Sequence, residues 1–499
     1  MERASIYLMH KYWGKKPAEE LNSLISKYSN ENDIVLDPFS GFGGVAIESL
    51  FLNRNVIIND LNPVAVFISK VILDETVDIL KAKKMFLQLK QTYVDFSNKW
   101  YCFKNGEILT ILRDKKDTPL KLKIKNGKKI SEISLSKEES ALFQETENAY
   151  KIDDWYPSDE LITNSRISVK KGMKICDLFS KRALLCHAYL YDKIIKLDNC
   201  PEKQLLLLAF TSNLANCSKL VPPIKSRGEM SQGAWMTGFY IGETYLENNV
   251  FHYFENRVNK VLKGKSDYLK LRESYGVRTN YSILNADAKN LPITSNTVDF
   301  VFTDFPYGDT VPYFEQSQLW NGWLRNTVDY NNEIVVSDSP ERNKNVNTFI
   351  NDINLSIQEI KRVLKEDKYF VFTFHSLDGA EWKSIIDSLR EYNFIFRDCS
   401  VLVQKTLPPR QLNRPNSIKG DIVAVFQNGN NKTIRNFDVV LEEKMSKINN
   451  LDYAFETNDL IVLFVNAMLE SLTAISINFK TLMEKYFQYN ENLNKWRKK

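Results

Sequence analysis

Two short segments of the chain combine residue types that can do chemistry. In the first, Asp37 opens a glycine-rich turn, and in the second, Asp304 opens the run Asp-Phe-Pro-Tyr at 304–307. Each acid follows a short apolar run, which predicts that it stands at the carboxyl end of a buried strand. In α/β sheets, ligands bind in the crevice outside the carboxyl ends of the strands. Both acids are therefore candidates for a ligand site.

The glycine-rich turn, residues 37–44 (Asp-Pro-Phe-Ser-Gly-Phe-Gly-Gly), lies where a strand is expected to pass into a helix. Glycines there let the backbone approach a nucleoside or an amino-acid carboxylate, and the helix N-terminus supplies N–H donors. The leading acid repels a pyrophosphate but suits an ammonium group, such as that of S-adenosylmethionine. Asp60 ends the next strand, where an acid can accept hydrogen bonds from both ribose hydroxyls. Taken alone, residues 37–44 have a second interpretation, which is a plain tight turn whose acid caps the following helix.

The segment that begins at Asp304 has the composition of a pocket for a planar amine. The carboxylate and a backbone carbonyl can accept hydrogen bonds from an exocyclic amino group, which draws its nitrogen toward a tetrahedral, nucleophilic geometry. The ring of Tyr307 can stack on the face of a base. Because Asp-x-Pro-Tyr is short and occurs by chance, a strand-end turn with a core tyrosine is the alternative.

Strands and helices alternate around both segments. Expected strands are 33–37, 55–60, 281–285, 298–303 and 369–374, and expected helices are 17–30, 45–52, 61–73, 313–324, 348–364 and 381–392. Residues 394–403 and 421–426 are expected to pair as a terminal hairpin. This order predicts a Rossmann-like α/β domain.

About two hundred residues interrupt the alternation. They begin with an expected helix at 81–99 and continue through Asn105-Gly106 and Asn126-Gly127, each a signal for a hairpin with a type I′ turn. Residues 136–274 are expected to be mostly helical, with a loop at 221–237, and residues 437–499 are expected to be helical. The predicted organisation is a first catalytic part at 1–75, an insertion at 76–280, a second catalytic part at 281–430 and a helical C-terminal region at 431–499.

The two segments together resemble motif I and the catalytic D-P-P-Y motif of the amino DNA methyltransferases, which methylate adenine N6 or cytosine N4. Further stretches resemble the stand-alone adenine-specific methylases of bacteria and archaea, a subgroup that often carries a zinc ribbon. These stretches are residues 10–17 (His-Lys-Tyr-Trp-Gly-Lys-Lys-Pro), 59–65, 304–313, 374–376 and 381–382. The resemblance covers roughly residues 5–75 and 150–427.

The resemblance implies an α/β class I fold that depends on S-adenosylmethionine, split by the insertion and followed by a helical tail. It also implies which residues bind that cofactor. They are Lys11, Tyr12, Asp37, Pro38, Phe39, Ser40, Gly41, Gly43, Asp60, Leu61, Asp287 and Ala288, with the turn at the methionine end, Asp60 at the ribose and the last two at the adenine. The implied catalytic residues are Asp304, Phe305, Pro306 and Tyr307, which act without a covalent enzyme intermediate.

Two departures from the family pattern stand out. Phe305 replaces the first proline of the motif, which keeps the backbone carbonyl as an acceptor and loses some rigidity. The cysteines of the zinc ribbon are missing, and Cys102 stands alone beside the first Asn-Gly pair. We therefore expect no metal.

Charge is unevenly distributed along the chain. Lys and Arg (67) exceed Asp and Glu (62) by 5, while residues 104–129 carry nine basic and three acidic side chains, a net of +6. Alternating lysines on a strand favour either phosphate contacts or the protection of a solvated sheet edge. The candidate DNA contacts are Lys121, Lys123, Lys125, Lys128, Lys129, Lys225, Arg227, Arg410 and Arg414.

Composition excludes several classes of protein. Hydrophobic residues (43%) and aromatic residues (12%) are too abundant for a disordered chain. No apolar run reaches the length of a membrane helix, and the N-terminus has no signal-peptide core. The six scattered cysteines form no C-x-x-C pair. The expectation is a reduced, cytoplasmic protein without a membrane partner.

The function predicted from the sequence is site-specific methylation of double-stranded DNA at an exocyclic amine. Adenine N6 is favoured over cytosine N4, because an initial acid in the motif leans toward adenine in the family. The expected setting is restriction–modification or phage defence, with a restriction endonuclease or a defence-system subunit as partner. Two alternatives stay open, an RNA methyltransferase acting on guanine N2 and a non-catalytic subunit that binds DNA or S-adenosylmethionine.

Overall fold

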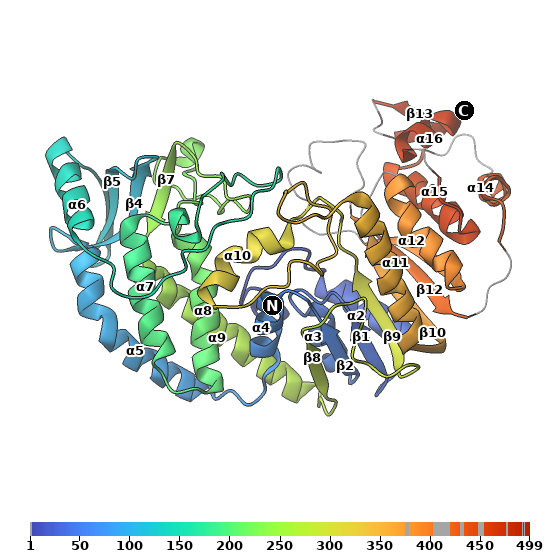
Figure 1. Cartoon of the computed structure of the whole chain (residues 1–499), viewed down its shortest axis with the longest axis horizontal. Helices are drawn as coiled ribbons and strands as arrows, with labels where there is room; N and C mark the ends of the chain where they lie inside the picture. Colours follow the sequence, from blue (N-terminus) through green and yellow to red (C-terminus); the bar gives the residue numbers. More distant parts are fainter. Residues whose placement is uncertain are drawn as a thin grey trace.

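The core of the molecule is a seven-stranded sheet near the middle of the chain's long axis (Figure 1). The computed structural model describes residues 2–374, 379–402, 420–429, 434–447, 454–475, 478–491, 493 and 495–499. In spatial order the strands are β11 (Phe394–Leu402), β12 (Asp421–Asn428), β10 (Leu364–Phe374), β9 (Val298–Asp304), β1 (Ile34–Asp37), β2 (Asn55–Asn59) and β8 (Tyr281–Leu284).

The direction of the strands identifies the place where a ligand binds. Strands β8, β2, β1, β9 and β10 run parallel, and β12 runs antiparallel to both of its neighbours. From β1 the chain proceeds outward through β2 on one side and returns through β9 on the other. The boundary between β1 and β9 is therefore the topological switch point, beyond whose carboxyl ends ligands bind. The strand order, with β12 reversed near one edge, is that of the class I methyltransferases, which confirms the predicted fold.

Successive residues of the central strands point to opposite layers, as the two-residue period of a strand requires. Phe300 and Phe302 of β9 pack with α2 (Ala18–Tyr28) and α3 (Gly44–Phe51). Val301 between them packs on the other face, with helices α11 (Val346–Val363) and α12 (Gly379–Glu391). Both faces are thus covered, which explains why the strands are almost continuously apolar.

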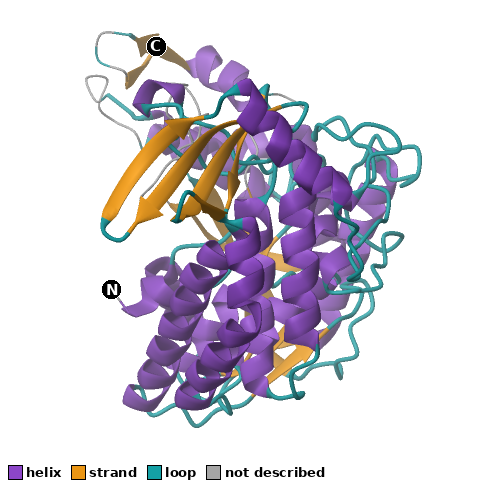
Figure 2. Cartoon of the chain, turned by 90° about the vertical axis from the view of Figure 1, so that its left-hand side faces the viewer, coloured by secondary structure: helices purple, strands orange, loops and turns teal. Residues whose placement is uncertain are grey.

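The insertion is built from long helices and a second sheet, and its core is continuous with that of the catalytic domain. Figure 2 shows its strands gathered to one side of the helices. The helices are α5 (Ile79–Trp100), α6 (Lys137–Ala149), α7 (Lys181–Ile195), α8 (Pro201–Leu214) and α9 (Val250–Ser274), and they pack beside α1 (Glu2–Tyr7), α4 (Pro63–Leu73) and α10 (Tyr313–Trp323). The strands are β3 (Cys102–Phe103), β4 (Gly106–Asp114), β5 (Pro119–Asn126), β6 (Lys129–Ser134) and β7 (Thr244–Asn248).

Both hairpins predicted from Asn-Gly pairs are present, but neither turn is centred on its pair. In the first, Lys104 and Asn105 have φ of +46° and +61° and form the turn. Gly106 pairs with Phe103 and already belongs to the strand. A glycine is needed there because a Cβ would lie 2.3 Å from Cγ2 of Ile124. The second hairpin turns through Gly127, whose φ is +59°, and the residue after it. Close packing of the neighbouring strand fixes the register in the first case.

Three expectations about regular structure are wrong. Residues 150–174 are mostly loop rather than helix, and β7 is a strand inside a segment expected to be helical. The C-terminal region contains α14 (Phe437–Ser446), α15 (Thr457–Ser471) and α16 (Phe479–Tyr486), but it ends in a hairpin of β13 (Phe487–Asn490) and β14 (Lys495–Lys498). Trp496 is buried by this hairpin, so packing of aromatic side chains outweighs the local preference for helix.

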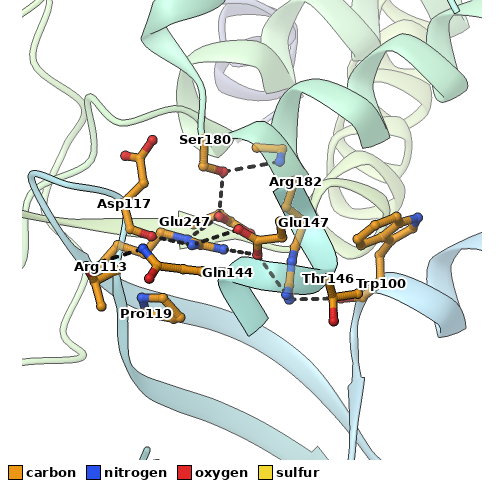
Figure 3. A network of polar contacts seen from close by, with 12 residues as sticks. Trp100, Arg113, Asp117, Pro119, Gln144, Thr146, Glu147, Ser180, Arg182 and Glu247 are labelled. Atoms are coloured by element: carbon orange, nitrogen blue, oxygen red, sulfur yellow. Dashed lines mark hydrogen bonds and ion pairs between the residues drawn. The ribbon is translucent and has the colours of Figure 1, made fainter. Parts of the chain in front are cut away.

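A buried network of charges joins four elements of the insertion (Figure 3). Arg113 on β4 donates to Glu247 on β7 at 2.6 Å and to Glu147 on α6 at 2.5 Å. Arg182 on α7 also reaches Glu147, at 2.8 Å. All four side chains are almost fully buried. Two positive and two negative charges balance, so the network can stay ionised out of contact with water.

Among the residues that the structure describes, no helix is long and apolar enough to cross a membrane.

Replacing Arg113 with methionine is expected to destabilise the protein strongly. The substitution leaves Glu247 without its cation, and breaking a buried ion pair from one side costs about 3–5 kcal/mol. Urea unfolding of the full chain measures this loss in the free energy of unfolding. Lys115→Met is the control, because its ion pair with Glu243 is exposed on both sides and should contribute nothing measurable. Equal destabilisation by the two variants would contradict the assignment.

Candidate active site

A pocket opens at the switch point, beyond the carboxyl ends of β1, β2 and β9. The loops after these strands and after β8, the segment between α1 and α2, the start of α10 and residues 332–334 contribute to its wall. The lining includes residues 12–16, 37–42, 59–61, 286–288, 313–314 and 332–334, together with Asp304 and Pro306.

The structure brings most of the predicted cofactor-binding residues together in this wall. They are Tyr12, Asp37, Pro38, Phe39, Ser40, Gly41, Asp60, Leu61, Asp287 and Ala288. Gly43 lies below the turn, with φ +83° and with a Cβ position 2.8 Å from Oγ of Ser69. Lys11 is not part of the lining, and its ammonium group lies 4.5 Å from the ring centre of Trp235.

Asp60 holds the glycine turn in place. Its carboxylate accepts hydrogen bonds from the backbone N–H of Gly41 at 2.7 Å and of Asn62 at 2.8 Å. Gly41 has φ +49°, and a Cβ there would lie 3.0 Å from the ring of Tyr12. Glycine is therefore required at this position both for the backbone conformation and for the close approach of the tyrosine.

The side chain of Asn59, for which no role was predicted individually, connects the loops after β1 and β8 to β2. It is fully buried at the end of β2. Its amide nitrogen donates to the carbonyl oxygens of Pro38 and Ala286, at 3.1 and 3.0 Å, and its amide oxygen accepts from the N–H of Ala286 at 3.0 Å. The loops after β1 and β8 are thus fixed relative to β2. An asparagine in a short apolar run is the sequence signal for such a role.

Burial shapes the electrostatics of the pocket. Burial raises the pKa of Asp60 to about 6, against the two N–H groups that favour its ionised form. Burial also raises the pKa of Asp37 well above its usual range, and the nearby carboxylates of Asp60 and Asp304 add to the shift. A positively charged ligand relieves this repulsion, because an opposite charge nearby favours the ionised form of a carboxylate.

These features fit a cationic nucleoside such as S-adenosylmethionine. Asp37 and Asp60 can accept hydrogen bonds from an ammonium group and from ribose hydroxyls, and the lining includes Tyr12, Leu61 and other apolar side chains that can enclose a base. The indole N–H of Trp13 is buried and has no hydrogen-bond partner within the described residues. Such an unpaired donor in a pocket wall is expected where a ligand supplies the acceptor.

Asp304 stands at the end of β9 on the same wall, and its two oxygens differ. Oδ1 accepts hydrogen bonds from the hydroxyl of Tyr307 at 2.5 Å and from Oγ1 of Thr373 at 2.6 Å, and it pairs with Nζ of Lys16 at 2.9 Å. Oδ2 faces Gly14, where a Cβ would be 3.2 Å away. Oδ1 is saturated with donors, so Oδ2 is the oxygen available to a ligand.

Packing holds the residue that replaces the family's proline. The side chain of Phe305 is 1% exposed, and its ring lies 5.4 to 6.1 Å from the rings of Phe39, Phe370 and Phe372. Pro306 lines the pocket. The backbone at 305 is thus restrained by a buried aromatic cluster rather than by a proline ring.

Lys16 is a buried cation shared by two carboxylates. Its side chain is 5% exposed, and Nζ lies 2.7 Å from Oδ2 of Asp421 as well as 2.9 Å from Asp304. Burial alone would lower the pKa of Lys16, but Asp304 and Asp421 outweigh it and raise that pKa. Burial raises the pKa of Asp304, Lys16 opposes this rise, and Asp421 adds to it. Lys16 therefore keeps Asp304 more acidic than burial alone would allow.

The sequence patterns predicted no site role for Lys16, Thr373 or Asp421. Lys16 lies in the stretch 10–17 that carries the resemblance, which was its only signal. Asp421 begins β12 and Thr373 lies near the end of β10, so both reach Asp304 only through the pairing of strands.

A second cluster missed from the sequence lies at the rim. Glu333 lines the pocket, and Arg342 pairs with it and with Glu315, the latter at 2.7 Å. Burial raises the pKa of Glu333 to about 8, Arg342 opposes the rise, and Glu315 adds to it.

The candidate DNA contacts are spread over several surfaces. Lys121 pairs with Glu229 at 2.9 Å, and Lys123 is half-buried on the same strand. Fully exposed cations are Lys125, Lys128, Lys129, Lys225 and Arg227, whereas Arg410 and Arg414 lie outside the described residues. Within the described ranges no group of three His, Cys, Asp or Glu side chains is placed to hold a metal ion, and the expected absence of a metal stays a prediction.

Comparison with known proteins agrees with the sheet and the pocket. A family model described as DNA methylase, of the N6/N4 type, matches residues 3–71, which contain the glycine turn and Asp60. The pocket and the family match fit S-adenosylmethionine as the cofactor. The N-terminal part of the chain is thus similar to this methylase family.

Solved structures similar to the chain are S-adenosylmethionine-dependent methyltransferases. One from Methanosarcina mazei is 8% identical over 82% of this chain and 98% of that chain, with a TM-score of 0.26. One from Thermotoga maritima is 14% identical over 32% of this chain and 67% of that chain, with a TM-score of 0.16. No curated protein matches the chain.

Cofactor affinity is expected to depend on the ionisation of Asp60. Its carboxylate form accepts the hydrogen bonds, and its pKa is about 6, so affinity should be full well above that pH and weaken as the pH falls through it. Below the pKa, each pH unit should cost up to about tenfold. Titration calorimetry with S-adenosylmethionine between about pH 5 and 8 measures this. Asp60→Asn keeps the side-chain size and removes the charge, so it should bind weakly with a flatter profile. A wild-type affinity that is independent of pH would contradict the role of Asp60.

Proposed function

We propose that this protein is a methyltransferase that modifies the exocyclic amine of a base flipped out of double-stranded DNA, with adenine N6 favoured over cytosine N4. The observation that carries the proposal is the state of Asp304. One of its oxygens is saturated by three donors, the other lies beside Gly14, and the residue lines the pocket together with the cofactor wall. A carboxylate held in this way offers one acceptor to a planar amine, and the match to a DNA methylase family supports DNA as its source.

The residues present account for each role in the transfer. When bound in this pocket, S-adenosylmethionine would supply an electrophilic methyl group, whose bond to the sulfonium sulfur breaks so that S-adenosylhomocysteine is the leaving group. Oδ2 of Asp304 accepts a hydrogen bond from the amino group and so directs the nitrogen lone pair toward the pocket. After the new N–C bond forms, the nitrogen carries a positive charge and releases a proton, which Asp304 accepts. Its raised pKa makes it a better proton acceptor than a solvent-exposed aspartate.

The aromatic residues of the segment position the base in this proposal. The ring of Tyr307 stacks on its face, while the tyrosine hydroxyl and Lys16 keep the carboxylate oriented. An acid at position 304 supports adenine as the target. We further propose restriction–modification or phage defence as the setting, with a nuclease or another defence subunit as partner, on the basis of the family resemblance.

Identification of the methylated base tests the proposal. The protein is incubated with labelled S-adenosylmethionine and either duplex DNA or tRNA, and the nucleosides are then separated. We expect label in N6-methyladenine from DNA. Label in N2-methylguanine from tRNA alone would instead establish the RNA alternative, and cofactor binding without transfer to either substrate would support a binding subunit.

Asp304→Asn is expected to lower the rate of transfer by about 10²- to 10⁴-fold, because the amide is a weaker acceptor and cannot take the proton. S-adenosylmethionine should still bind, since the cofactor carboxylates Asp37 and Asp60 are intact. Single-turnover methylation and calorimetry measure the two properties. Transfer at the wild-type rate would refute the role of Asp304.

Lys16→Met is expected to move the acid limb of the pH–rate profile to higher pH. Lys16 lowers the pKa of Asp304, so without it the carboxylate stays protonated to a higher pH. Misplacement of the carboxylate should also lower the rate by about 100-fold at the optimum. Lys16→Arg restores the charge and should return the profile to its original position. An unshifted profile in the methionine variant would show that Lys16 has only a structural role.

A further inference from the structure

Two loops of the insertion reach across to the catalytic half. The first bridging loop, residues 162–174, is attached to the catalytic half at its start. The N–H of Ile162 donates to Oε1 of Gln318 on α10 at 2.9 Å, and the N–H of Ser165 donates to Asp338 at 3.1 Å. Arg166 forms an ion pair with Asp309, which follows the catalytic segment closely in the chain.

The second bridging loop, residues 221–243, contacts the segment that lines the cofactor pocket. The ring of Trp235 receives the ammonium group of Lys11 at 4.5 Å and lies 6.2 Å from the ring of Trp320 on α10. The two loops are joined to each other, because the N–H of Ser168 donates to the carbonyl of Gly238 at 2.7 Å. Figure 1 shows them, in teal and green, above α10 and beside the loops that follow β9.

Both bridging loops carry exposed positive charge. Residues 163–174 contain four cations and no acid. The exposed cations without an ion pair among the described residues are Lys170, Lys171 and Lys174 in the first loop and Lys225 and Arg227 in the second. Unpaired, exposed cations on two joined loops, the first of which is tied to Asp309 after the catalytic segment, are an arrangement that can bind a phosphate backbone.

The basic hairpin of β5 and β6 is less suited to this role. The Lys121 side chain is paired with Glu229, and Lys104 and Lys115 are paired with Glu139 and Glu243. Figure 1 places β5 and α6 at the left end of the molecule, away from β9. A duplex that delivers a base to Asp304 has to pass close to Asp309 and to the N-terminal segment, which Arg166 and Trp235 of the bridging loops contact.

We propose that the two bridging loops form the edge that binds the DNA phosphates and sets the position of the duplex over the pocket. This inference rests on the proposed function for its choice of DNA. Lys170, Lys171 and Lys174 contact phosphates on one side of the flipped base, and Lys225 and Arg227 contact them on the same edge from the second loop. Because Arg166 and Trp235 tie the loops to Asp309 and Lys11, the phosphates are held at a fixed offset from the catalytic carboxylate.

The salt dependence of DNA binding by the full chain tests this proposal. Binding of a duplex is measured by fluorescence anisotropy at several KCl concentrations, with S-adenosylmethionine present. Each phosphate contact contributes roughly 0.9 to the slope of log K against log salt, so Lys170→Ala, Lys171→Ala and Lys174→Ala together should reduce the slope by as much as about 2.7. The double variant Lys225→Ala, Arg227→Ala should reduce it by as much as about 1.8.

The matched control removes three exposed cations from the hairpin, with Lys125→Ala, Lys128→Ala and Lys129→Ala, and changes the net charge equally. It should leave the slope nearly unchanged. Cofactor affinity and melting temperature report that each variant is folded. If the hairpin variant lowers the slope and the loop variants do not, the proposal is overturned.

A second probe separates this inference from the proposed function. The same variants are measured with tRNA. Binding to tRNA but not to DNA, with the slope again reduced by the loop variants, would retain the phosphate-binding edge and reject DNA as the substrate. Wild-type protein that binds neither nucleic acid would overturn both.

Discussion

The buried ammonium group of Lys16 is the interaction on which the active site depends. It allows Asp304 and Asp421 to stand together at the carboxyl edge of the sheet, where each alone would lose several kcal/mol of hydration. The same lysine orients Asp304 by occupying one of its oxygens. Gly14, with φ +72°, lets the backbone pass close to the other oxygen. The path of the N-terminal segment therefore shapes the wall of the cofactor pocket and also orients the catalytic acid.

The requirement that buried charges be balanced also organises the insertion. Arg113 and Arg182 are neutralised by Glu147 and Glu247, and these pairs fix two strands against two helices. With the interior neutral, the positive excess of the insertion is found on its surface. The bridging loops carry part of that excess toward the catalytic half, and in our proposal this charge binds an anionic substrate.

Much of the catalytic domain could be predicted from the sequence, because its strands are short apolar runs followed by acids or glycines. The strands that end at Asp37 and Asp304 follow this pattern. The segment 150–174 could not be predicted, because its backbone is held by contacts with residues far away in the chain rather than by a local period. The C-terminal hairpin around Trp496 could not be predicted either, since burial of its aromatic rings decides its structure.

The charges of residues 104–129 also differ between what the sequence predicts and what the fold shows. A count along the chain gives residues 104–129 a net charge of +6, but the fold places Glu139, Glu243 and Glu229 beside three of its lysines. Such partners cannot be read from a window of sequence, because Coulomb interaction depends on distance in space.

The sequence by itself determined that acids end the parallel strands and meet at one edge, since the carboxyl ends of parallel strands share an edge. It also determined the glycine turn, because only glycine tolerates the backbone angles and the close approach found at Gly41. The tertiary structure alone decided which oxygen of Asp304 is free. That depends on Lys16 and Thr373, which lie far from it in the chain and reach it only when the sheet and the N-terminal segment are assembled.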